Sequence, residues 1–167
     1  MKYQKPFIHI FAGIDATVCC LSAVAQDQPE PLPTSVPTPV VDPGHQSPRA
    51  TMATFLGAFY EEPPDLAAAS ACLDLAGISG EIRHLQGREL AVQLKKVLDR
   101  TVLVDLEAVP DRSDGDVYRV VEQASGTIEI GRTATGEWLF TVATVHSLDA
   151  LWEEVRDRPV LGGVEQT

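Results

Sequence analysis

Apolar residues recur at helical spacing where the chain leaves its proline-rich first third. Met52, Phe55 and Phe59 lie three or four positions apart, and Ser47 and Pro48 before them suit an N-cap and a first helical residue. An acidic run with two prolines follows, and proline cannot continue a helix. The pattern therefore predicts a helix that begins at Pro48 and ends before this run.

Two more helices are expected next. The first begins near Asp65 and runs to Leu75, with an alanine-rich face that would allow a neighbouring helix to approach closely. The second covers residues 80–100. Its early apolar stripe is out of phase with its later one across Gly87, which favours a break or kink there.

The second half of the chain changes to the period of β-strands. A β-branched run over 102–106 comes first. Ile128 and Ile130 point to one face of a strand and Glu129 to the other, which predicts a sheet with one solvated face. Turn residues separate three short strands, which are expected at 117–122, 127–132 and 137–141.

A closing helix is expected from about Thr144 until Pro159 ends it. Its buried stripe comprises Val145, Leu148, Leu151, Trp152 and Val155. The predicted fold is α+β, with three N-terminal helices, a short antiparallel meander of about three to four strands, and a C-terminal helix. The domain is assigned to residues 49–158, followed by a flexible tail at 159–167.

Two segments precede this domain. Residues 1–25 have lysines, an apolar stretch and a small-residue cleavage site, which predict an export signal; an uncleaved N-terminal anchor is the alternative, although Asp15 interrupts the apolar stretch. Residues 26–48 hold seven of the twelve prolines and are expected to form an extended linker. These segments predict an exported, periplasmic protein, either free or associated with the inner membrane, with no membrane span in the mature chain.

Charge narrows the classes of partner. Thirteen lysines and arginines stand against 24 acidic residues, which gives a formal net charge of -11. Such a chain repels the phosphates of nucleic acids and anionic lipids, so no nucleic-acid partner is expected. A protein partner or a homo-oligomer is compatible with this composition.

The residues do not form a catalytic or metal-binding motif, so no enzyme, cofactor or metal is predicted. Cys72, among small and apolar neighbours, is expected to be a buried, inert thiol. The competing enzyme hypothesis pairs His84 or His146 with a carboxylate of the 111–116 turn. Asp111, Asp114 and Asp116, with Glu107 upstream, offer oxygen ligands for calcium, but their spacing does not match a calcium-binding loop, and a solvated hairpin turn is the favoured interpretation.

Several short runs resemble one known family. The runs are Ser47–Leu56, Ala71–Leu75, Glu89–Ala91, Leu94–Thr101, Val109–Asp111, Gly126–Ile130, Gly136–Phe140 and Thr144–Val145. Together they resemble the extramembrane N-terminal domain of bacterial small-conductance-type mechanosensitive (MscS-like) ion channel proteins, over about residues 47–157. The resemblance implies a periplasmic sensory or assembly domain, present here without a pore.

A second resemblance gives the alternative. The first helix and the late Gly-x-Trp-x-Phe strand are similar to SnoaL-like α+β domains, which would imply an independent exported module that binds a small ligand or a protein partner. In either case a working surface should be apolar and unused by the core. The second helix, with Ala67, Ala68 and Ala71, is the candidate; an internal helix is the competing interpretation.

Overall fold

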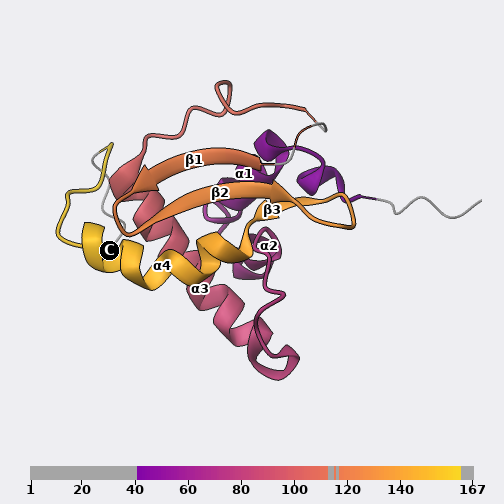
Figure 1. Ribbon diagram of the computed structural model, residues 1–167, viewed down its shortest axis with the longest axis horizontal. Helices are drawn as coiled ribbons and strands as arrows, with labels where there is room; N and C mark the ends of the chain where they lie inside the picture. The colour runs from indigo at the N-terminus through magenta and orange to yellow at the C-terminus, as the bar shows by residue number, and fades with distance from the viewer. Residues whose placement is uncertain (1–40, 113–114, 116, 163–167) are drawn as a thin grey trace, which may run out of the picture. The chain divides into compact units, whose positions relative to one another are not determined.

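The computed structural model describes residues 41–112, 115 and 117–162, all within one compact unit. The expected signal segment and most of the expected linker lie outside the described residues. The fold is α+β, as predicted, with the helices and strands in separate parts of the chain (Figure 1). In order, its elements are a 3-10 helix η1 (Pro43–His45), α1 (Pro48–Ala58), α2 (Leu66–Ala71), α3 (Gly80–Thr101), β1 (Val117–Gln123), β2 (Gly126–Arg132), β3 (Trp138–Phe140) and α4 (Val142–Val155).

Helix α1 begins where its capping signals predict. The Ser47 hydroxyl accepts a hydrogen bond from the backbone N–H of Ala50, and Met52 and Phe55 are fully buried. The packed chain begins earlier than the linker boundary at residue 48, however. Residues 43–45 form η1, and the His45 side chain is buried, because it packs into the domain beside α1 and α2.

Helix α2 ends at Ala71, four residues before the expected end at Leu75. The chain changes direction there because it pairs with β3. The N–H of Phe140 donates to the carbonyl of Cys72 at 2.8 Å, and the N–H of Asp74 donates to the carbonyl of Phe140 at 2.8 Å. A parallel bridge between Leu73 and Phe140 therefore covers the outer edge of β3.

Helix α3 runs without a break from Gly80 to Thr101, so, of the break or kink expected at Gly87, the break is wrong. Gly87 is buried against α2. A Cβ at this position would lie 2.8 Å from Leu75 Cδ1 and 3.3 Å from Ser70 Cβ. The glycine permits close helix packing instead of ending the helix.

The strands form one antiparallel sheet in the order β1–β2–β3. Ile128 and Ile130 are buried, whereas Glu129 pairs with Arg119 on the other face at 3.2 Å, which confirms the predicted alternation. The β-branched run 102–106 is not a strand. Its first residue, Val102, donates its N–H to the carbonyl of Leu98 in α3, and the run is hydrogen-bonded to no strand among the described residues.

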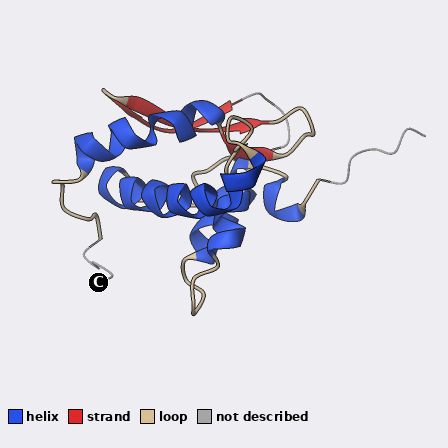
Figure 2. Cartoon of the chain, turned by 90° about the horizontal axis from the view of Figure 1, so that it is seen from below, coloured by secondary structure: helices blue, strands red, loops and turns tan. Residues whose placement is uncertain are grey.

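The core lies between the sheet and the helices, which gather on one side of it (Figure 2). Helix α4 packs on β2 and α3, and its predicted stripe is buried except for Trp152, which is half-buried. Trp138 and Phe140 bring β3 into the centre, where the Phe140 ring meets Phe55 edge-to-face at 5.1 Å.

Candidate functional site

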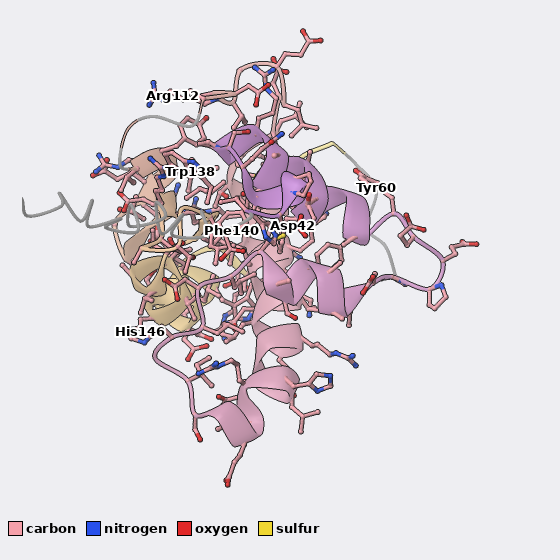
Figure 3. All side chains as sticks on the ribbon, turned by 90° about the vertical axis from the view of Figure 1, so that its right-hand side faces the viewer. Asp42, Tyr60, Arg112, Trp138, Phe140 and His146 are labelled. Atoms are coloured by element: carbon pink, nitrogen blue, oxygen red, sulfur yellow. The ribbon has the colours of Figure 1, made fainter. Side chains whose placement is uncertain are left out.

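Neither of the two histidines proposed for an enzyme is hydrogen-bonded to Asp111, the one aspartate of the 111–116 turn among the described residues. His84 is exposed on α3, and His146 is exposed on α4 at the outer edge of the molecule (Figure 3). Among the described residues, no hydrogen bond joins a histidine to a carboxylate. The geometry that the enzyme hypothesis needs is therefore not present in the described part of the chain.

The acidic turn is described only in part. Asp114 and Asp116 lie outside the described residues. Asp111 accepts a hydrogen bond from the Ser47 hydroxyl at 2.8 Å and lies 3.7 Å from the Arg49 guanidinium. These contacts tie the chain after α3 to the start of α1. Within the described ranges there is no cluster of three or more potential metal ligands.

The structure brings Cys72 together with His45, although His45 lies within residues 26–48, which were expected to form an extended linker. The Cys72 Sγ lies 3.7 Å from His45 Nε2 and 3.5 Å from the carbonyl of Ala68. Burial, and secondly the charge of Asp42, raises the pKa of the Cys72 thiol to about 12. The thiol therefore stays protonated near neutral pH, and the pair joins η1 to α2 as a structural contact.

A hollow that we call the α3 groove lies along the last turns of α3. It has a volume of about 730 Å³ and lies against the end of α1, the segment after α3 and the last described residues. The backbone N–H of Leu161 donates to the carbonyl of Asp99 at 2.7 Å, which fixes residues 160–162 as one wall. The expected flexible tail is thus held to α3 at this point. The apolar lining of the α3 groove includes Leu56, Phe59, Tyr60, Leu103, Val104 and Leu161.

Basic side chains border the same groove. Lys95 is paired with Asp99 at 2.6 Å. Lys96 and Arg100 have no carboxylate partner among the described residues; instead they lie over the Trp152 ring, 5.8 and 5.2 Å from its centroid. Residues distant in sequence make this site, so periodicity along the chain could not reveal it.

The first two turns of α3 form a second notable surface, which we call the α3 arm (residues 79–86). Every residue of the arm is exposed, and the helix projects away from the sheet here (Figure 1). Ile82 is 45% exposed and Leu85 is 64% exposed. The early apolar stripe of α3 therefore contributes little to the core and faces outward.

The alanine surface of α2 exists as well. Ala67 and Ala71 are exposed, Ala68 is half-buried, and Ala69 is fully buried, so the helix is internal on one side only. Small side chains present little apolar area. The α3 arm offers larger apolar groups than α2 does.

No protein-family model matches this chain, and neither a curated protein nor a solved structure matches it. The resemblances to the channel domain and to SnoaL-like domains therefore stay predictions. None of the helices in the described ranges is long and apolar enough to cross a membrane. What the chain does has to follow from the contacts, burial and charges of these residues.

Proposed function

We propose that the chain is a non-enzymatic, periplasmic assembly domain of a mechanosensitive-channel-like system, and that it works through contacts between copies of itself. The exposed apolar stripe of the α3 arm carries this proposal. In such a system the domain couples contacts outside the membrane to the membrane helices of its partners. The sequence resemblance supports the placement in the envelope.

The arm is suited to a contact between copies because its apolar residues lie one turn apart. Ile82 and Leu85 share one side of the helix. Two arms crossing about a twofold axis place Ile82 of one copy against Leu85 of the other, which is the self-complementary arrangement of a symmetric dimer. Burying these side chains supplies the hydrophobic free energy for association.

Charge favours the same surface. The whole chain carries a formal net charge of -11, which opposes the approach of two copies. Within the arm, however, the only formally charged residues are Glu81, which is acidic, and Arg83, which is basic. The formal net charge of the arm is therefore zero. Two arms can therefore meet with less repulsion than two average surfaces.

The test uses substitutions at the tip of the arm. Ile82→Asp and Leu85→Asp should each shift the full chain toward monomer in sedimentation velocity, since each would place a carboxylate in the contact. Leu103→Asp is the matched control, because Leu103 is 76% exposed but lies in the α3 groove. Equal behaviour of all three variants would refute a role of the arm.

The alternative, an independent ligand-binding module, is favoured by a different observation, the α3 groove. Its volume falls within the range of about 300–1,000 Å³ of small-molecule sites. The two functions involve different residues and are separable by mutation.

A further inference from the structure

Exposed apolar side chains concentrate at the α3 groove. Three of the six large apolar residues with exposed side chains in the described part line it: Tyr60 at 73%, Leu103 at 76% and Leu161 at 43%. Isolated exposed apolar residues are ordinary on protein surfaces. By contrast, the convergence of Tyr60, Leu103 and Leu161 on one concave surface indicates a site for an apolar group.

The charges at the groove have one predominant sign. Asp99 is the only acidic residue among the described residues that line it, and the two oxygens of that carboxylate both accept from Lys95 Nζ, at 2.6 and 2.7 Å. Lys96 and Arg100 then leave an excess of positive charge. Arg100 Nε is buried and has no hydrogen-bond partner among the described residues.

We propose that the α3 groove binds a single-chain amphipathic carboxylate, independently of the assembly role of the arm. The hydrocarbon chain packs between Leu103 and Leu161, and the carboxylate lies at Lys96 and Arg100. A guanidinium donates to both oxygens of a carboxylate, and an ammonium adds a compact positive charge beside it. The ligand thus satisfies the apolar and the cationic sides of the groove together.

The occupant is a free molecule and not a bilayer. An anionic membrane surface would face the charge of the whole chain, which is strongly negative. A small ligand within the groove is governed by nearby groups, since salt screens charges that lie farther away than about 8–10 Å. The concave shape of the groove also fits a single hydrocarbon chain better than it fits the flat surface of a membrane.

The first experiment is calorimetric titration of the full chain with decanoate below its micelle concentration. Saturable binding at one site per chain is expected. Decyltrimethylammonium, which keeps the chain and reverses the head charge, and acetate, which keeps only the head, should each bind at least about tenfold more weakly. Decanoate that fails to bind, or binds no better than either control, overturns the proposal.

Variants then locate the site. Leu103→Ser should weaken decanoate binding about tenfold through lost apolar contact, and Lys96→Gln about fivefold through lost charge. Ile82→Ser and Arg132→Gln are the controls, because they change an exposed apolar residue and an exposed cation outside the groove. Circular dichroism verifies folding, and Leu161→Ser replaces Leu103→Ser if that variant does not fold.

Losses of equal size in the controls would overturn the site, as would binding to phosphatidylglycerol vesicles without binding to free decanoate. A failure of ligand binding at the groove can be distinguished from a failure of the proposed assembly through the arm. Ile82→Ser tests the arm and leaves the groove intact, whereas Leu103→Ser changes the groove and leaves the arm intact.

Discussion

At the first residue of β2 the backbone and helix α4 meet so closely that only glycine fits. A Cβ at Gly126 would lie 2.7 Å from Ser147 Cβ and 3.4 Å from Leu151 Cγ. The contact with Leu151 is close to an ordinary van der Waals distance, but Ser147 Cβ is bonded directly to the α4 backbone and cannot move away cheaply. By contrast, a Cβ at Gly57 on α1 would meet nothing within 4 Å.

Gly126→Ala should therefore lower the free energy of unfolding by about 1–3 kcal/mol through overpacking. Gly57→Ala should leave it unchanged or raise it by up to about 1 kcal/mol, since alanine is the better helix former. Urea unfolding of both variants measures the difference. A Gly126→Ala protein as stable as the wild type would show that β2 and α4 do not approach this closely.

The Cys72 thiol makes stability depend on alkaline pH. Its pKa is about 12 in the folded chain, against 9.0 for an ordinary thiol. Between these values the unfolded chain loses the proton and the folded chain keeps it. The free energy of unfolding should therefore fall as pH rises from 9 toward 12.

Cys72→Ala removes this contribution, so the decrease with pH should be shallower in the variant, whatever its stability at pH 7. Urea midpoints at several pH values between about 8 and 11 measure how steeply stability falls with pH in the wild type and in the variant. Parallel slopes would mean that the thiol is not protected from ionising.

Residue-level chemistry was predictable only where it depends on sequence neighbours. The buried state of Cys72 was expected, and its small, apolar neighbours gave the reason. Its contact with His45 was missed because 27 positions separate the two residues and nothing local relates them. The same reason hides the α3 groove, whose walls come from α1, α3 and the last described residues.

At the scale of elements, the turn between β1 and β2 is fastened to α4 by one carboxylate. Glu154 accepts hydrogen bonds from the backbone N–H and the hydroxyl of Ser125, and it pairs with Arg158 at 2.9 Å. The side-chain and backbone hydrogen bonds from Ser125, and then the charge of Arg158, hold the pKa of Glu154 below its usual value.

A lowered pKa means that this contact stabilises the fold above the ordinary glutamate pKa and is lost as pH falls through the lowered value. Glu154→Gln should reduce stability at pH 7 and make the acid side of the stability curve flatter. Thermal unfolding between about pH 3 and pH 7 measures both the stability and its dependence on pH. Glu153→Gln is the control, since Glu153 is exposed and its only ion-pair partner in the described part of the chain is Arg156, one turn away. Equal effects of both changes would contradict a specific role of Glu154.

Element bounds followed the sequence where capping is local and departed from it where tertiary contacts decide. The start of α1 was predicted because Ser47 and Pro48 act on their immediate neighbours. The end of α2 was not, because the pairing of Cys72 and Asp74 with Phe140 sets it. The run 102–106 has the composition of a strand, but no neighbouring strand pairs with it in the described part of the chain.

At the scale of the whole molecule, net charge should set how the proposed association depends on salt. The chain carries a formal charge of -11, while the α3 arm is neutral. The proposed association through the arm would be opposed by long-range repulsion and driven by apolar contact. Raising the salt concentration from about 0.05 to 0.5 M screens the repulsion and should strengthen association.

Light scattering at fixed protein concentration follows this salt dependence. A contact made by ion pairs would behave in the opposite way and weaken as salt rises. Ile82→Asp should abolish the increase. Association that strengthens with salt equally in this variant would indicate a contact elsewhere on the surface.

The central claim is that the chain assembles through the α3 arm. Sedimentation equilibrium of the full chain over a series of protein concentrations, beside the double variant Ile82→Ser/Leu85→Ser, tests it most directly. A reversible monomer–dimer equilibrium is expected for the wild type, and a monomer is expected for the variant at the same concentrations. A wild type that stays monomeric throughout, or a variant that dimerises as tightly, would contradict it.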